Sequence, residues 1–176
     1  MAWTVFIDGK EGTTGLRIFD RLAERGEFSL LTLPEEKRKD ADARREAIHA
    51  ADISILCLPD AAARESVALA EGSKTRILDT STAHRVAPGW AYGFPELSKK
   101  HRAAVVSGQY VAVPGCHASG FIALAAPLVA AGLIPADALL SCFSLTGYSG
   151  GGKKMIAQYE ADTRTPDLDA PRPYGL

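Results

Sequence analysis

Short apolar, β-rich runs alternate with helical segments along much of this chain, and this alternation restricts its possible folds more than any other feature. The runs are WTVFID (3–8), FSLLTL (28–33), DISILCLP (52–59) and RILDTS (76–81). A helical pattern of Leu16, Phe19 and Ala23 follows the first run, and a helical segment ending at Gly72 follows the third. Strands alternating with helices form βαβ units, so the sequence predicts an α/β fold with a mostly parallel sheet.

Three more apolar runs extend the pattern. AVVSG (104–108) and YVAVPG (110–115) predict one or two further strands. LLSCFSLTGYSG (139–150) predicts another strand near the C-terminal end.

Composition and charge exclude several classes of partner. The 176 residues carry 20 Lys plus Arg and 21 Asp plus Glu, a formal net charge of −1, which gives no electrostatic grip on nucleic acid or on an anionic membrane. The N-terminal sequence lacks a signal peptide, and no run is long enough to span a bilayer. We therefore expect a cytoplasmic protein whose partners are small molecules.

A cluster of glycines follows the first predicted strand. Gly9, Gly12 and Gly15 stand at GxxGxxG spacing where the first helix opens, with Thr13 and Thr14 between them. Glycines at this place let backbone N–H groups approach a pyrophosphate at a helix N-terminus, so the pattern indicates a Rossmann-type dinucleotide site. A tight strand-to-helix turn without a ligand is the alternative.

The end of the second run bears on which dinucleotide is bound. Leu33 and Pro34 occupy the place where an acidic residue commonly holds the ribose 2′-hydroxyl of NAD, and Lys37, Arg38 and Lys39 follow. Loss of the carboxylate beside a basic run favours a 2′-phosphate and hence NADP. The alternative is that these three charges form a solvated surface.

The three cysteines differ in their surroundings. No CxxC pair occurs among them, which argues against a disulfide framework and a metal site. Cys116 follows a Pro-Gly turn and precedes a helical pattern, and a helix N-terminus favours a reactive thiolate. Cys57 and Cys142 lie within apolar runs, where we expect buried, inert thiols. A packed thiol is also the alternative for Cys116.

Five short motifs together resemble the N-acetyl-γ-glutamyl-phosphate reductase family, in its shorter subfamily, which is related to aspartate-semialdehyde dehydrogenase. The motifs, in chain order, are DGKEGTTG (8–15), DTSTAHR (79–85), YGFPEL (92–97), VPGCHASGF (113–121) and TGYSGGGKK (146–154). The resemblance extends through essentially the whole chain, and the order of the motifs is more specific than any one of them.

The resemblance implies an NADP-binding domain over residues 1–116 and the beginning of an α+β substrate and dimerisation domain over 117–176. It also implies a homo-oligomer, dimer or tetramer. Cys116 would be the nucleophile. The implied cofactor-binding residues are Gly9, Gly12, Thr13, Thr14, Gly15, Pro59 and Ser81, and the implied substrate-binding residues are Arg85, Ser149, Gly150 and Gly151.

The implied reaction is the NADPH-dependent reduction of N-acetyl-γ-glutamyl phosphate, through a thioester on the cysteine. The family's acid–base histidine comes later in the second domain, so we expect a truncated chain. None of His49, His84, His101 and His117 is an obvious replacement, and we expect surface or packing roles for them. The alternatives are a non-catalytic dinucleotide-binding module, a reductase of another acyl phosphate of aspartyl or aminoadipyl type, and a cysteine hydrolase.

Overall fold

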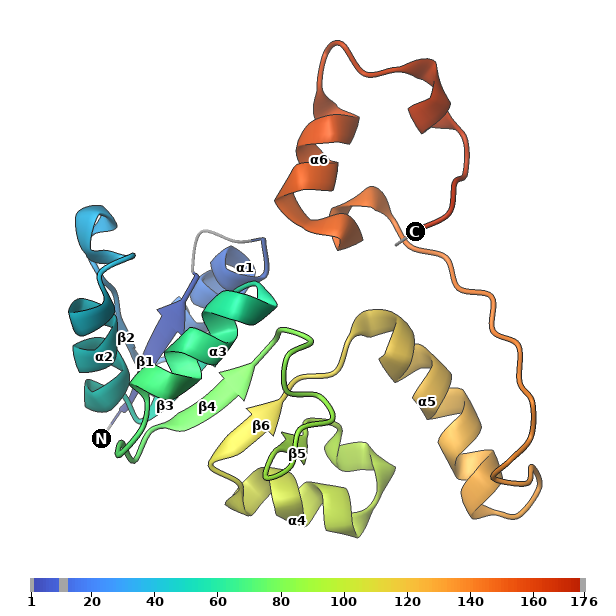
Figure 1. Ribbon diagram of the computed structural model, residues 1–176, viewed down its shortest axis with the longest axis horizontal. Helices are drawn as coiled ribbons and strands as arrows, with labels where there is room; N and C mark the ends of the chain where they lie inside the picture. The colour runs from blue at the N-terminus through green and yellow to red at the C-terminus, as the bar shows by residue number, and fades with distance from the viewer. Residues whose placement is uncertain (1, 10–12, 175–176) are drawn as a thin grey trace. The chain divides into compact units, whose positions relative to one another are not determined.

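The computed structural model describes residues 2–9 and 13–174, which fall into two compact units, residues 1–139 and 140–176 (Figure 1). The first unit contains a six-stranded sheet in the order β2-β1-β3-β4-β6-β5, and every strand pair in it is parallel. The strands are β1 (Trp3–Asp8), β2 (Phe28–Leu31), β3 (Ile53–Leu56), β4 (Arg76–Asp79), β5 (Ala91–Tyr92) and β6 (Tyr110–Ala112). The predicted α/β fold with a parallel sheet is confirmed.

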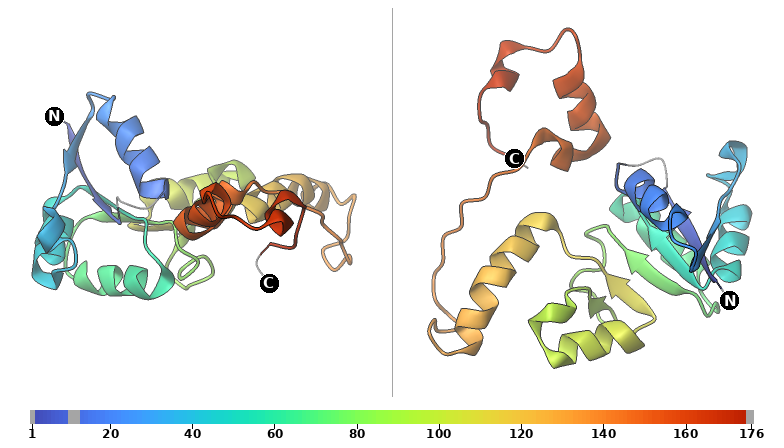
Figure 2. Two further views of the ribbon diagram at one scale, coloured as in Figure 1. Left: turned by 90° about the horizontal axis from the view of Figure 1, so that it is seen from above. Right: turned by 180° about the vertical axis from the view of Figure 1, so that it is seen from behind.

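Helices connect the strands and cover the sheet. They are α1 (Thr13–Ala23), α2 (Ala41–Ala50), α3 (Asp60–Leu69), α4 (Lys99–Ser107) and α5 (Cys116–Ala130) in the first unit. Short 3₁₀ turns, η1 (Glu35–Lys37) and η2 (Pro95–Leu97), lie between them. Figure 2 shows α1 on one face of the sheet and α2 and α3 on the other, which is the arrangement of a doubly wound fold.

The core lies between the sheet and the helices α2 and α3. Ile48, Leu56 and Ile77 are each fully buried, and Phe6 and Ala63 pack in the same cluster. Alternate residues of β3 and β4 are buried, and the residues between them are partly covered, as expected for strands with helices on both faces.

The segment AVVSG is helical, so the strand predicted there is wrong. Residues 104–107 form the last part of α4, whose first turn is capped by Ser98: the hydroxyl accepts a hydrogen bond from the His101 N–H at 3.2 Å. Lysine, arginine and alanine in that helix favour helix formation over the β preference of two valines. YVAVPG supplies β6 instead.

The second unit contains η3 (Tyr148–Gly151), α6 (Gly152–Glu160) and η4 (Pro166–Asp169). Tyr148 stacks on Tyr159 with ring centroids 5.0 Å apart, and its hydroxyl donates to Glu160 at 2.9 Å. Residues 138–147 have no regular structure, so the strand predicted within 139–150 is wrong. A strand needs a partner for its backbone groups, and no pairing is formed there among the described residues.

Candidate active site

The candidate site lies at the carboxyl ends of the parallel strands. The order of the sheet reverses between β1 and β3, because β2 lies on one side of β1 and the later strands lie on the other. In open α/β sheets the ligand crevice forms at such a switch point, outside the carboxyl ends of the strands. Gly9, Pro59 and Ser81 follow β1, β3 and β4 directly or closely, and therefore belong to this edge.

Gly9 is packed against the neighbouring loop more tightly than any side chain would allow. Its φ is +83°, and a Cβ there would lie 2.3 Å from the Cys57 carbonyl oxygen. The adjacent backbones are also joined by the Cys57 N–H, which donates to the Asp8 carbonyl at 2.8 Å. This turn therefore requires glycine, for its conformation and for the close approach.

The rest of the glycine motif leads into the first turn of α1. Thr13 begins α1, and Thr14 is exposed and Gly15 buried within the same helix. Gly12 lies outside the described residues. The motif thus connects the end of β1 to the start of α1, which is where a pyrophosphate would meet a helix N-terminus.

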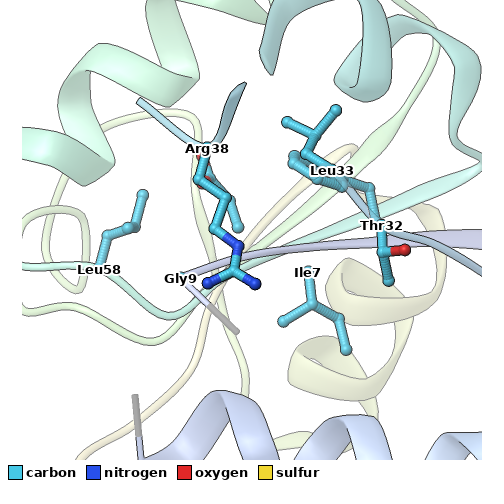
Figure 3. A pocket seen from close by; sticks show the side chains of 8 residues that line it. Ile7, Gly9, Thr32, Leu33, Arg38 and Leu58 are labelled. Carbon is cyan, nitrogen blue, oxygen red and sulfur yellow. The ribbon is translucent and has the colours of Figure 1, made fainter. Parts of the chain in front are cut away.

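A pocket of about 180 Å³ lies beside this turn, at the ends of β1 and β2 (Figure 3). The Arg38 side chain points into it, opposite Leu58 and the Ile7 side chain. Lys37 and Lys39 are exposed and do not line the pocket. Of the three basic residues in the predicted run, only the middle one is therefore placed to meet a ligand here. The pocket is lined by Phe6, Ile7, Asp8, Gly9, Thr32, Leu33, Arg38 and Leu58.

A buried ion pair beneath the turn was not anticipated from the sequence. Asp8 and Arg44 are each 6% exposed, and the Arg44 Nη2 donates to the Asp8 Oδ2 at 3.1 Å. The Ser66 hydroxyl donates to the same oxygen at 2.7 Å. This cluster ties β1 to α2 and α3. The only sequence signal for it was a charged residue at the end of an otherwise apolar strand.

The segment after β4 is held by two carboxylates. The fully buried Asp79 accepts the Ser81 N–H at 2.9 Å and the Ser81 hydroxyl at 2.7 Å. Asp60, in the first turn of α3 after Pro59, accepts the Thr82 N–H and hydroxyl. The Thr82 hydroxyl lowers the pKa of Asp60. The two carboxylates together fix the loop that carries Ser81 and Arg85.

Cys116 is the first residue of α5, with Gly115 at the N-cap, as the sequence predicted. Cys116 is exposed. One turn into the helix, the N–H and the hydroxyl of Ser119 both donate to the Gly115 carbonyl at 2.8 Å. The unpaired N–H groups of a helix N-terminus stabilise negative charge. A nucleophile at this place is both accessible and electrostatically supported.

Arg85 links the segment after β4 to the turn before Cys116. Its Nε donates to the Val113 carbonyl at 3.1 Å, and its Nη2 donates to the Thr80 carbonyl at 3.2 Å. A Cβ on Gly115 would come within 2.8 Å of the Arg85 Nη1. The guanidinium therefore lies against the backbone that leads into α5.

The other two cysteines differ from each other. Cys57 is half-buried at the end of β3, and burial raises the pKa of its thiol to about 11. Cys142 is exposed, so its predicted burial is wrong: residues 138–147 form no strand that could cover it. Cys57 is therefore less buried than predicted, and its raised pKa supports the inert thiol that stays a prediction.

The histidines separate into packing and surface positions. His84 is 6% exposed and donates through Nδ1 to Asp79 at 2.6 Å, so of the two expected roles, surface or packing, it has the packing one. His49 is exposed and bonds the Leu69 carbonyl, while His101 bonds Ser98 at the start of α4. His117 lies half-buried in the first turn of α5.

Serine and glycine residues of the last motif lie in the second unit. Ser149, Gly150 and Gly151 lie in η3, directly before α6. Within residues 2–9 and 13–174, no three His, Cys, Asp or Glu side chains gather into a group that could hold a metal ion. In the same part of the chain, no helix has both the length and the apolar character needed to cross a bilayer.

Comparison with known proteins identifies the family. Residues 4–105 match the NAD binding domain of semialdehyde dehydrogenase, and residues 116–176 match the semialdehyde dehydrogenase dimerisation domain. The chain belongs to the semialdehyde dehydrogenase family. The predicted domain boundary after residue 116 stays a prediction, because the compact units of the structure divide elsewhere, after residue 139.

Curated relatives in this family carry the name that the motifs suggested. N-acetyl-γ-glutamyl-phosphate reductase of Chelativorans sp. (strain BNC1) is 54% identical over 178 residues, which cover 100% of this chain and 56% of the relative. The enzyme of the same name from Brucella ovis is 54% identical over 93% of this chain and 53% of its own length. The resemblance drawn from the motifs is confirmed. The chain spans about half the length of these relatives.

Solved structures of the family share the fold. Aspartate semialdehyde dehydrogenase from Francisella tularensis superposes with a TM-score of 0.66 at 16% identity, covering 90% of this chain and 48% of that one. The Candida albicans enzyme, solved with NADP, gives a TM-score of 0.54 at 16% identity over 73% of this chain and 47% of its own.

Proposed function

We propose that the protein is an NADPH-dependent N-acetyl-γ-glutamyl-phosphate reductase, which forms N-acetylglutamate 5-semialdehyde and inorganic phosphate. The observation that carries the proposal is the position of Cys116: an exposed thiol at the first residue of α5, beside the Arg85 guanidinium and at the edge of the sheet that also holds the Gly9 turn. The identity of 54% to curated reductases supports this choice among acyl-phosphate substrates.

The described residues fit a phosphorylated dinucleotide. Gly9 forms the tight turn that the adjacent Cys57 backbone requires, and this turn leads towards the first residue of α1, where a helix N-terminus can bind a pyrophosphate. Arg38 points into the adjacent pocket and supplies a cation for a 2′-phosphate, where Leu33 supplies no carboxylate for a ribose hydroxyl. Pro59 and Ser81, at the ends of β3 and β4, complete the proposed cofactor residues with Gly12, Thr13, Thr14 and Gly15.

In the proposed mechanism, the Cys116 thiolate attacks the acyl carbon of the substrate. A carbon–sulfur bond forms, the bond to the phosphate oxygen breaks, and inorganic phosphate leaves a thioester on the enzyme. NADPH, when bound, supplies the hydride that reduces this thioester. The resulting thiohemiacetal loses its carbon–sulfur bond, which releases the semialdehyde and restores the Cys116 thiolate.

Two groups of residues are proposed for the anionic substrate. Arg85 would bind its phosphate, because the guanidinium lies against the turn that carries the nucleophile and guanidinium groups pair well with phosphate. Ser149, Gly150 and Gly151 are proposed from their motif, and they share the 3₁₀ turn η3 in the second unit. The match to a dimerisation domain supports a homo-oligomer, dimer or tetramer, and we propose a cytoplasmic location.

The reverse reaction tests the proposal. Reduction of NADP by N-acetylglutamate semialdehyde should require phosphate and should fall at least about 1,000-fold in Cys116→Ser, since the covalent step is lost. Cys142→Ser is the matched control, because that cysteine is exposed but lies in no regular structure. Phosphate-independent turnover, or a Cys116→Ser enzyme as active as Cys142→Ser, would contradict the proposal. Aspartate semialdehyde as the better substrate would assign another acyl phosphate.

The cofactor choice is tested separately at Arg38. Arg38→Ala should weaken NADP binding by about 10- to 100-fold and change NAD binding by less than about 2-fold, because a charge-assisted hydrogen bond to the 2′-phosphate is lost. Lys39→Ala is the control, since Lys39 is exposed and does not line the pocket. Fluorescence titration with each dinucleotide measures both constants. Equal losses in the two variants would assign the preference to general surface charge.

A further inference from the structure

The loop that follows β4 and leads to Arg85 is folded around one buried carboxylate. Asp79 is fully buried, and its Oδ1 accepts the Ser81 N–H at 2.9 Å. Its Oδ2 accepts the Ser81 hydroxyl at 2.7 Å and the His84 Nδ1–H at 2.6 Å. The Ser81 hydroxyl oxygen in turn accepts the Ala83 N–H at 3.1 Å. A carboxylate out of contact with water needs hydrogen-bond donors, and these come from the loop that follows Asp79, so the carboxylate fixes the conformation of that loop.

His84 is held by packing as well as by this bond. Its ring stacks on Trp90 with centroids 4.1 Å apart and planes 10° from parallel. Trp90 lies against Tyr110 of β6, with centroids 5.2 Å apart, and packs on the hydrophobic core. The imidazole is therefore fixed between a buried anion at the end of β4 and an aromatic side chain supported by the next strand.

Arg85, the residue after His84, links this loop to the segment that leads to the Cys116 nucleophile. Its guanidinium bonds the Thr80 carbonyl, at the start of the loop, and the Val113 carbonyl, at the end of β6. The Asp79 carbonyl accepts the Val113 N–H at 2.8 Å. The backbone path of residues 80–84 thus decides where the guanidinium lies relative to Gly115 and the first residue of α5.

We propose that His84 is a positioning residue: its hydrogen bond to Asp79 sets the Thr80–Arg85 loop, and through Arg85 it sets the site for the substrate phosphate beside Cys116. The inference rests on the proposed function, in which Arg85 binds that phosphate. In this inference His84 acts through Arg85 and not by contact with the substrate.

Two substitutions separate the two contacts of His84. Phenylalanine keeps a ring to stack on Trp90 but removes the donor to Asp79. Asparagine can place its amide N–H near the position of Nδ1 but removes the ring. If the hydrogen bond positions Arg85, His84→Phe should raise the KM for phosphate by about 10-fold in the reverse reaction, and His84→Asn should restore it to within about 3-fold of wild type.

The control substitution is His49→Phe. His49 is exposed on α2 and bonds a backbone carbonyl at the end of α3, away from the β4 loop. A purely structural role of His84 would lower the yield of folded enzyme, and hence kcat, without a selective change in the KM for phosphate. In an Arg85→Ala background, His84→Phe should raise the KM for phosphate by less than about 2-fold further, because His84 acts on the phosphate site only through Arg85.

A second measurement does not depend on turnover. Amide hydrogen exchange should accelerate in His84→Phe both in residues 80–85 and in residues 113–117, and should stay at the wild-type rate there in His49→Phe. If His84→Phe does not fold, Asp79→Asn provides the second variant, because its amide can no longer accept all three hydrogen bonds.

The outcomes distinguish this inference from the proposed function. A wild-type enzyme with phosphate-dependent activity, together with an unchanged phosphate KM in His84→Phe, overturns the inference alone. A wild-type enzyme without that activity overturns the proposed function and, with it, the phosphate site in this inference. Hydrogen exchange in residues 113–117 then decides whether His84 sets the Thr80–Arg85 loop: faster exchange in His84→Phe supports that part, and an unchanged rate overturns it.

Discussion

At Gly9 the backbone of the candidate site approaches the neighbouring backbone of Cys57 very closely. Its positive φ and the Cys57 carbonyl beside it both exclude a side chain, whereas Gly72, with φ of +78°, has no atom within 4 Å of the position of a Cβ. The two glycines therefore share the backbone conformation and differ in the space around them. This difference separates the cost of conformation from the cost of a clash.

We predict that Gly72→Ala lowers the free energy of unfolding by about 1 kcal/mol, which is the cost of a left-handed alanine. Gly9→Ala should lower it by roughly 3 kcal/mol or more, because the loop that begins at Cys57 must also move. Urea unfolding measures both. Equal losses in the free energy of unfolding would mean that the turn at Gly9 shifts at little cost and does not hold β1 against β3.

At the scale of elements, the buried cluster of Asp8, Arg44 and Ser66 joins β1 to α2 and α3. The Arg44 Nη1 also reaches the exposed carboxylate of Glu65 at 2.8 Å. A buried carboxylate that loses its cation remains desolvated, so the cost of removing one partner exceeds the value of the pair.

Arg44→Met should therefore lower the free energy of unfolding by about 3–5 kcal/mol. Arg45→Met is the control from the next position of α2, where the ion pair with Asp42 is exposed, and it should cost less than about 0.5 kcal/mol. Adding Asp8→Asn to Arg44→Met should cost less than the sum of the single changes. Similar losses at positions 44 and 45 would show that the buried pair contributes little.

Much of the site was predictable at this scale. The glycine turn after β1 and the cysteine at the start of α5 are encoded by neighbouring residues, through turn and helix preferences. The pairing of Asp8 with Arg44 joins residues 36 positions apart, and it has no local signature. The apolar run of residues 104–107 alone favours a strand, because the serine that caps this helix, Ser98, lies six residues before the run.

At the scale of the whole molecule, the two compact units meet in the sequence within a stretch that has no regular structure. Leu139, Phe143 and Leu145 in this stretch are among the most exposed large apolar residues of the described chain. Exposed backbone without regular hydrogen bonding is the preferred substrate of proteases.

Limited chymotrypsin digestion of the 176-residue chain should therefore cut first between residues 139 and 145. The aromatic residues Phe6 and Trp90, which lie in or against the core, should survive at the same protease concentration. Mass spectrometry of the first products locates the cut. An initial cut between residues 28 and 112 would contradict the division into these units.

The parallel α/β architecture, the glycine turn and the place of Cys116 at a helix start follow from patterns of residues adjacent in the chain, so the sequence was enough to predict them. The packing of distant segments was needed to show that Arg38 and not its lysine neighbours lines the pocket, that His84 is buried against Asp79, and that Cys142 is exposed. These outcomes depend on which segments far apart in the sequence pack together, and the burial of a charge or thiol is a property of that packing.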